Sequence, residues 1–278
     1  MIFMDRRWQF QFPGPSGAAV SARTGRIIQC AFHCVHARCT EHTEDELQHK
    51  GNHMLISDND GLSWRLGAVV AEGAPVWGDE CQVAFAGRRL VMSARHDANN
   101  QSLSRSGSGR GIAFSDSEGT RFGAARLDPT LPDAICGGSL ISWPGSPRLG
   151  GGLLSSNVWS GAADRLAPDW RANLTLSFST TGRGWRPLLH VWRGIASYSS
   201  LALLDNNRVG VLYNQYAEPS WPCKSPVRPH GCEPGGGRVV FAVVALKSDD
   251  GHLRPNRTHR WESGLSPRLQ WLGNDGVK

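Results

Sequence analysis

Short segments in which apolar and polar residues alternate recur along the whole chain, and each ends at turn-forming residues. This period of two is typical of half-buried β-strands, and no long apolar segment follows the period of a helix. The pattern predicts an all-β protein of many short antiparallel strands. The segments are 25–32, 53–56, 81–85, 89–93, 111–114, 139–142, 152–155, 174–176, 201–204, 209–213 and 238–246.

A turn motif follows three of these strands. Its copies are SDNDGLSW at 57–64, SDSEGTRF at 115–122 and the shorter STTGRGW at 179–185. The aromatic ends Trp64, Phe122 and Trp185 lie 58 and 63 residues apart, which suits one four-stranded blade of a propeller per repeat. In each copy the leading polar side chain can cap the turn, and glycine can adopt the positive φ that the turn needs.

Composition narrows the functional classes. The 278 residues include 33 Gly and 16 Pro, as expected for a turn-rich fold, and no run of about 18 apolar residues predicts a membrane span. The formal charge of +6 comes mainly from scattered arginines rather than a lysine-rich run, so we expect a solvated basic surface and no nucleic-acid partner. The first twelve residues carry charge where a signal peptide needs an apolar core, so no secretion signal is expected.

Four polar residues stand in positions that suit a site at one face of a propeller. Glu80 heads one predicted strand and Arg95 ends its hairpin partner, while Arg171 precedes another strand and Tyr198 lies among small residues. Each residue has a plainer structural interpretation as a turn cap, a surface arginine or a half-buried hydroxyl. Their order along the chain favours a common site.

The segments DECQV, LVMSAR, RANLTLSFS and ASYSSLALL, taken with the repeated turns, resemble the sialidases, and most closely the animal lysosomal sialidase. The turns themselves resemble the Asp box of that family. The resemblance implies a six-bladed β-propeller of which about four blades are present here. It divides the chain into an irregular segment 1–24, an incomplete propeller 25–246 and a polar tail 247–278.

The resemblance also implies roles for the four polar residues. Tyr198 matches the nucleophile and Glu80 its base, while Arg95 and Arg171 match two of the three arginines that grip the substrate carboxylate. A neutral phenol suits a substrate whose anomeric carbon already bears a carboxylate, because a second carboxylate would be repelled. The expected activity is release of terminal sialic acids from glycoproteins, gangliosides or oligosaccharides, with retention and without metal or other cofactor.

Departures from the family make the activity an open question. No Arg-Ile-Pro motif supplies the first arginine, no residue matches the acid/base Asp, and Asn214 stands where the family usually has Glu. We therefore expect weak activity or none, either from an incomplete sialidase or from a true short relative. The alternatives are a non-catalytic sialic-acid-binding propeller or scaffold and, more remotely, a nucleic-acid-binding protein.

Seven cysteines leave at least one thiol unpaired. Cys223 and Cys232 flank a Pro-rich loop that a disulfide could close. The cluster of Cys30, Cys34 and Cys39 with His33, His36 and His42 fits no known zinc spacing, so no metal site is expected. Glycan acceptor triplets begin at Asn173 and Asn256, and the resemblance implies a lysosome or another secretory lumen.

Overall fold

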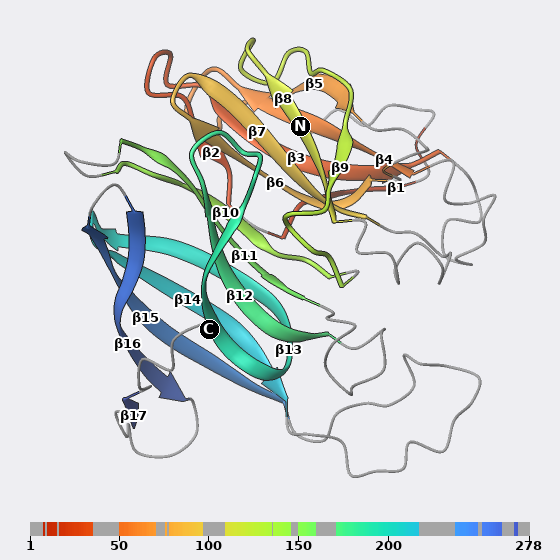
Figure 1. Ribbon diagram of the computed structural model, residues 1–278. Helices are drawn as coiled ribbons and strands as arrows, with labels where there is room; N and C mark the ends of the chain where they lie inside the picture. Colours follow the sequence, from red (N-terminus) through yellow and green to blue (C-terminus); the bar gives the residue numbers. More distant parts are fainter. Residues whose placement is uncertain are drawn as a thin grey trace, which may run out of the picture.

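The computed structural model describes residues 8, 10–15, 17–35, 50–70, 76, 78–96, 109–134, 136–145, 150–159, 171–216, 237–249, 252–262 and 270–271. Every regular element in these residues is a β-strand, and all strand pairs are antiparallel (Figure 1). The prediction of an all-β protein is confirmed. The described part of the chain holds no helix with the length and apolarity needed to cross a membrane.

Nine strands form two separate sheets in the first half of the chain. The first sheet has the order β1-β3-β4-β5, and β2 pairs with β3 beside β1. The second sheet has the order β6-β7-β8-β9. Their bounds are β1 Phe10–Pro13, β2 Ala19–Val20, β3 Ile27–Cys34, β4 Lys50–Ser57, β5 Arg65–Val70, β6 Gly78–Ala86, β7 Arg89–His96, β8 Arg110–Ser115 and β9 Arg126–Asp128.

The second half of the chain forms one continuous sheet in sequence order from β10 to β17. Its long strand β13 changes partner midway: residues 186–195 pair with β12, and residues 196–205 pair with β14. The sheet therefore consists of two units joined by one strand, which gives four antiparallel units in all. The bounds are β10 Ser139–Trp143, β11 Gly152–Val158, β12 Ala172–Ser179, β13 Arg186–Asp205, β14 Arg208–Tyr216, β15 Gly237–Asp249, β16 His252–Glu262 and β17 Gln270–Trp271.

The repeated turns share one hydrogen-bond pattern. The hydroxyl that opens each turn accepts backbone N–H bonds from the second and the third or fourth residue after it, and glycine follows with φ near 84°. Those hydroxyls belong to Ser57, Ser115 and Ser179, and the glycines are Gly61, Gly119 and Gly182. The capping and the positive φ are as the sequence predicts, so the three turns are structural copies.

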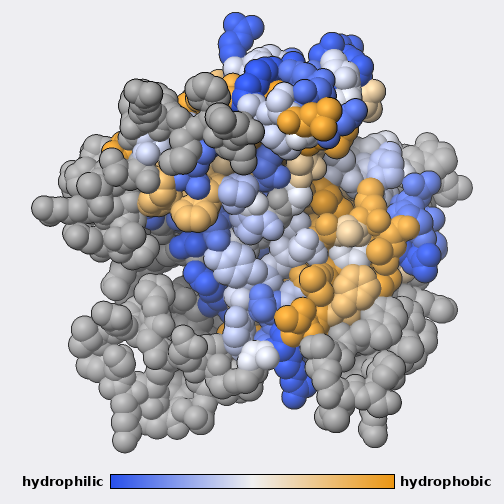
Figure 2. Space-filling model, turned by 180° about the vertical axis from the view of Figure 1, so that it is seen from behind, coloured by the Kyte–Doolittle hydropathy of each residue, from blue (hydrophilic) through white to orange (hydrophobic). Residues whose placement is uncertain are grey.

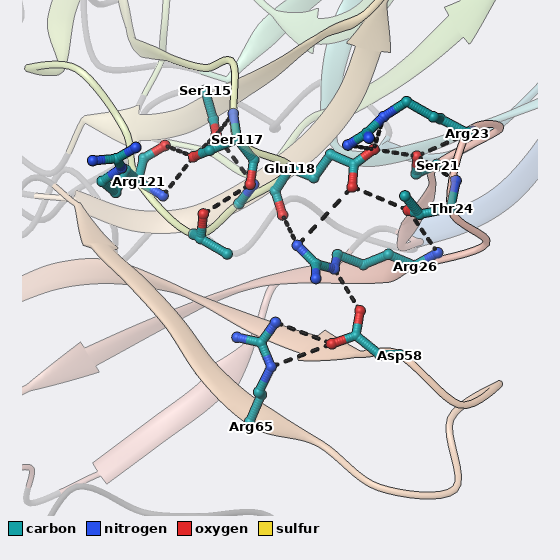
Figure 3. A network of polar contacts seen from close by, with 12 residues as sticks. Ser21, Arg23, Thr24, Arg26, Asp58, Arg65, Ser115, Ser117, Glu118 and Arg121 are labelled. Carbon is teal, nitrogen blue, oxygen red and sulfur yellow. Dashed lines mark hydrogen bonds and ion pairs between the residues drawn. The ribbon is translucent and has the colours of Figure 1, made fainter.

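The second turn ties the first two sheets together (Figure 3). The Glu118 carboxylate accepts hydrogen bonds from Ser21 Oγ at 2.5 Å and Thr24 Oγ1 at 3.0 Å, and it pairs with Arg23 Nη2 at 3.0 Å. Arg26 links the two turns, because its Nε contacts Asp58 at 2.6 Å while its Nη1 contacts the carbonyl of Glu118 at 3.4 Å. A turn of one sheet is thus anchored on the loop before β3 of its neighbour.

Apolar side chains fill the space between neighbouring units. One core cluster joins Ile28, Met54 and Ile56 of the first sheet to Val83 and Leu90 of the second. A second cluster joins the second sheet to β10, β11 and the turn residue Trp185. The disulfide Cys30–Cys81 adds a covalent link between β3 and β6, with both cysteines fully buried.

Apolar side chains also reach the surface. Figure 2 shows them gathered in bands on the face that it presents. Exposed examples from the last unit are Leu203, Leu204, Leu212 and Val239 on β13, β14 and β15.

The expected domain boundaries at 24/25 and 246/247 stay predictions, but the neighbouring segments differ from the irregular structure expected there. β1 and β2 lie before residue 25 and pair with β3. Beyond residue 246, β16 pairs with β15 from Asp249↔His252 to Val240↔Glu262. Backbone pairing explains both differences, since a strand whose hydrogen bonds are satisfied by a neighbour does not need a regular apolar pattern.

Candidate active site

Glu80 lies near the start of β6, where the strand is irregular. The register with β7 shifts between Gly78 and Cys81, and such a bulge redirects the side chains beside it. Asp79 holds this bend, because its Oδ1 accepts the backbone N–H of Glu80 at 2.7 Å and its carbonyl accepts Asn52 Nδ2 at 2.6 Å. The next residue, Cys81, is fixed by its disulfide to Cys30. The Glu80 backbone is therefore held from both sides.

Tyr198 lies on β13, just beyond the point where this strand changes partner. The register with β14 shifts between Ala196 and Ser199, so the strand is irregular here as well. The hydroxyl groups on either side are engaged: Ser197 with Tyr216 at 3.2 Å and Ser199 with Ser156 at 2.9 Å. Tyr198 itself is 37% exposed.

The phenol of Tyr198 donates a hydrogen bond of 2.5 Å to Glu80 Oε1, across 118 residues of sequence. Arg95, from the end of β7, places Nη1 3.0 Å from the other oxygen, Glu80 Oε2. The Glu80 and Arg95 side chains are each 14% exposed. One carboxylate therefore binds a phenol and a guanidinium at once, and the geometry allows direct proton transfer between Tyr198 and Glu80.

Arg171 reaches the same region from the residue before β12. Its carbonyl accepts the N–H of Ala196 at 2.9 Å, two residues before Tyr198. The backbone bends immediately afterwards, where Asn173 has a φ of 54°. The guanidinium groups of Arg171 and Arg95 both act on the Cys136 thiol: burial raises the pKa of this thiol to about 11, and the two positive charges partly oppose that rise.

Burial and the neighbouring Glu80 carboxylate both raise the pKa of Tyr198 well above its usual value. Burial disfavours the phenolate, and Glu80 stabilises the phenol by accepting its proton in the hydrogen bond and disfavours the phenolate by its negative charge. Tyr198 is therefore a neutral phenol at physiological pH. It can act as a nucleophile only when its proton passes to an acceptor as the new bond forms.

The segment before β10, to which the sequence assigned no role in the site, contacts this group directly. A Cβ on Gly137 would lie 2.6 Å from Tyr198 Cε1 and 3.1 Å from Glu80 Oε2, so only glycine fits. The Gly137-Gly138 pair immediately before a predicted strand was the available signal, because paired glycines often mark a close approach of backbone. The buried Arg110 that holds this segment carried no comparable signal.

A cavity of about 1010 Å³ opens elsewhere in the structure. It is lined by the last part of β6, including Phe85, by β10 and by residues 17–23. None of Tyr198, Glu80, Arg95 and Arg171 lines it. The site is therefore identified by its convergent polar groups and the raised pKa of Tyr198 rather than by the size of a hollow.

The other candidate residues are the cysteines and histidines from Cys30 to His42, Asn214, Cys223 and Cys232, and the structure describes only some of them. Cys30 forms a disulfide and Cys34 is disulfide-bonded as well, so neither is a thiolate ligand, and the described residues hold no cluster suited to a metal ion. Asn214 lies on β14 opposite Val239. Cys39, His36, His42, Cys223 and Cys232 lie outside the described residues.

No family model matches the chain. Among solved structures, it resembles the Hadza microbial sialidase Hz136, with a TM-score of 0.56 and 21% identity over 76% of this chain. The Trypanosoma rangeli sialidase matches 76% of this chain with a TM-score of 0.55 and 15% identity. The NanB sialidase from Streptococcus pneumoniae matches 73% of it with a TM-score of 0.54 and 14% identity. The chain has the fold of the sialidases.

The chain spans only a part of these sialidases: 37% of the Hadza enzyme, 30% of the trypanosomal enzyme and 28% of NanB. The sialidase fold agrees with the predicted propeller, and the four antiparallel units correspond to the predicted number of about four blades. At identities of this size, structural likeness establishes the fold and not the activity.

Proposed function

We propose that the chain is a retaining exo-α-sialidase in which Tyr198 is the nucleophile and Glu80 its base. The observation that carries the proposal is the hydrogen bond of 2.5 Å from the Tyr198 phenol to Glu80 Oε1, with Arg95 on the other carboxylate oxygen. A carboxylate hydrogen-bonded to a phenol can act as the general base that removes its proton, which activates the phenol oxygen as a nucleophile. The sialidase fold of the chain supports the same assignment.

In the proposed first step, Tyr198 Oη attacks the anomeric carbon of a terminal sialic acid, and its proton passes to Glu80 Oε1. The bond from the anomeric carbon to the leaving oxygen breaks, and that oxygen carries the electron pair away. Water then attacks the same carbon from the side opposite Tyr198, and the bond from that carbon to Tyr198 Oη breaks. The Tyr198 oxygen takes its proton back from Glu80, the proton that water loses passes to solvent, and the sugar is released with its original configuration. No metal or organic cofactor takes part in this scheme.

Arg95 and Arg171 are proposed to bind the substrate carboxylate. Guanidinium groups suit this task because they donate parallel hydrogen bonds to both carboxylate oxygens. Arg95 lies 3.0 Å from Glu80, so the same arginine would orient the base and hold the substrate. Arg171 would approach from the β12 side, where its carbonyl already binds the backbone before Tyr198.

The finer resemblance to the animal lysosomal sialidase, including its Asp boxes, supports glycoproteins, gangliosides and oligosaccharides as the glycans. It also supports a lysosome or another secretory lumen as the compartment. Because the sequence offers no counterpart of the acid/base Asp, cleavage of an alkyl sialoside would lack a proton donor. We expect such cleavage to be about a hundredfold to ten-thousandfold slower than in a complete enzyme, while an aryl sialoside should suffer less.

The decisive experiment compares Tyr198→Phe with the unaltered chain on an aryl sialoside. We expect the substitution to abolish measurable turnover because it removes the attacking oxygen and little else. Tyr216→Phe is the matched control, since it also removes a phenol from the neighbouring strand and should leave turnover almost unchanged. If the unaltered chain binds sialosides but neither protein cleaves them, the chain is a binding propeller and the proposal is wrong.

A further inference from the structure

The segment that leads into β10 forms a wall against both proposed reacting groups. Gly137 lies so close to the Tyr198 ring that a Cβ there would be 2.6 Å from Cε1 and 2.7 Å from Cδ1. The same Cβ would be 3.1 Å from Glu80 Oε2. The two distances to the ring are shorter than real carbon contacts and the one to the carboxylate is unusually tight, so the position of this backbone limits where the ring and the carboxylate can lie.

Arg110, the first residue of β8, holds this segment from within the second sheet. Its side chain is 1% exposed, and its Nη1 donates to the carbonyl of Cys136 at 2.9 Å. Its Nε donates to Ser93 Oγ on β7 at 2.9 Å, and its backbone N–H donates to the carbonyl of Leu131 at 3.0 Å. A rigid planar guanidinium can satisfy such divergent acceptors together, whereas an ammonium group cannot.

Asp133 completes the attachment. Its carboxylate accepts the backbone N–H groups of His96 at 3.0 Å and Cys136 at 3.3 Å, and its Oδ2 lies 3.5 Å from Arg110 Nη1. On the opposite side, Asn157 Nδ2 of β11 donates to the carbonyl of Pro132. A buried ion pair adds little net stability, because desolvation offsets the attraction, so a role in fixing geometry accounts better for its presence.

We propose that Arg110 and Asp133 are positioning residues, which fix the backbone at 136–137 and thereby set the contact between Tyr198 and Glu80. The catalytic consequence of this arrangement rests on the proposed function. The structural consequence, the placement of the Tyr198 phenol against Glu80, does not. The two can therefore be measured separately.

The first test uses Gly137→Ala, with Gly17→Ala as the matched control because a Cβ there would meet nothing within 4 Å. The chain contains three tyrosines, so NMR of protein labelled with ¹³C at the tyrosine Cζ gives few signals. The signal that disappears in Tyr198→Phe is assigned to Tyr198. In Gly137→Ala the added methyl group should push the ring away from Glu80. We expect the pKa of Tyr198 to fall toward the ordinary value near 10, while Gly17→Ala leaves it unchanged.

The second test uses Arg110→Lys, with Arg89→Lys as its control, since Arg89 forms an exposed ion pair with Asp116 in the same sheet. Lysine keeps the positive charge beside Asp133 but cannot bind Ser93 and Cys136 together. We expect the titration of Tyr198 to shift as in Gly137→Ala. On an aryl sialoside, kcat should fall about tenfold to a hundredfold with little change in KM.

The outcomes separate this inference from the proposed function. If no variant cleaves sialosides but Arg110→Lys shifts the Tyr198 titration as Gly137→Ala does, the positioning role stands and the activity does not. If the folded Arg110 or Asp133 variant titrates and turns over like its control, Arg110 and Asp133 serve stability alone and the inference is wrong, whatever Gly137→Ala does. Should Arg110→Lys fail to fold, Asp133→Asn takes its place and is judged by the same Tyr198 titration, with the exposed Asp116→Asn as its control.

Discussion

Glu80 divides its two oxygens between two partners: Oε1 accepts from Tyr198 and Oε2 pairs with Arg95. A carboxylate held at both oxygens cannot rotate away from the phenol without breaking an ion pair. This arrangement keeps the acceptor aimed at the one proton that the proposed first step must move.

Replacing Glu80 with glutamine tests whether that acceptor is chemical or only structural. Glu80→Gln retains the size and one hydrogen bond to Tyr198 but cannot take a proton, so kcat on an aryl sialoside should fall about a hundredfold to ten-thousandfold. Steady-state kinetics measure the effect. A fall of less than threefold would show that the proton leaves by another route.

Cys136 provides a second prediction at this scale. The thiol is fully buried, and burial raises its pKa to about 11, so almost no thiolate exists at pH 8. Iodoacetamide should therefore leave Cys136 unmodified in the folded protein at pH 8 and modify it after denaturation, as peptide mass spectrometry would show. Rapid labelling in the folded protein would contradict the buried position.

The residues of the proposed site could be predicted from the sequence, but the residues that hold them in position could not. Tyr198, Glu80 and Arg95 each had a plain structural interpretation when taken singly, their combined order favoured a common site, and the structure brings them into contact. Arg110 and Asp133, which are far apart in the sequence, contact each other and the backbone of Cys136 only in the folded protein. Nothing local in the sequence marks such a meeting, and only the Gly137-Gly138 pair hinted at it.

At the scale of the elements, the second repeated turn contributes more than its own geometry. Glu118 occupies the position of Asp60 in the first turn, and both residues have a positive φ, 51° and 54°. The longer side chain of Glu118 reaches Ser21, Thr24 and Arg23 beside the first sheet. The turn thereby becomes a tie between two sheets.

The pKa of Glu118 is lowered, since the hydrogen bonds and the Arg23 charge outweigh the opposing effect of burial. A lowered pKa in the folded state means that the stabilisation is present above the unfolded value of 4.5 and is lost as the pH falls through the folded value. Glu118→Gln should lower the melting temperature by about 2–4 °C at pH 7 and by much less in acid. Calorimetry against pH measures the difference.

The control for that substitution is Asp116→Asn in the same turn, whose exposed carboxylate pairs only across the surface with Arg89. Exposed pairs contribute little, so this variant should melt like the unaltered chain. Equal melting temperatures for Glu118→Gln and the unaltered chain at pH 7 would contradict the assigned tie.

The hairpins β6–β7 and β13–β14 were predictable because each has a two-residue turn flanked by alternating strands, Gly87-Arg88 in the first and Asn206-Asn207 in the second. The length of β13 could not be predicted in this way. Its register shifts against both neighbours interrupt the alternation, and Gly194 and Ser197 resemble a break between strands. The change of partner at 195/196 depends on the meeting of two units of the sheet, which no local pattern encodes.

At the scale of the whole molecule, the buried disulfide Cys30–Cys81 joins the first two sheets at β3 and β6. It closes a loop with a sequence separation of 51 residues, and a loop of that length restricts the unfolded chain considerably. Replacing both cysteines with serine should lower the free energy of unfolding by about 2–4 kcal/mol. Urea denaturation measures this as a lower midpoint, and an unchanged midpoint would contradict the prediction.

β13 gives this architecture a mechanical consequence. One uninterrupted strand of 20 residues closes one four-stranded unit and opens the next, and Tyr198 stands three residues past the joint. If one unit tilted against the other, β13 would have to bend between them, and the Tyr198 phenol lies close to that bending point. Glu80, by contrast, belongs to a different sheet that the disulfide clamps to its neighbour. Relative motion of the units would therefore open or close the gap between phenol and carboxylate before it disturbed either one alone.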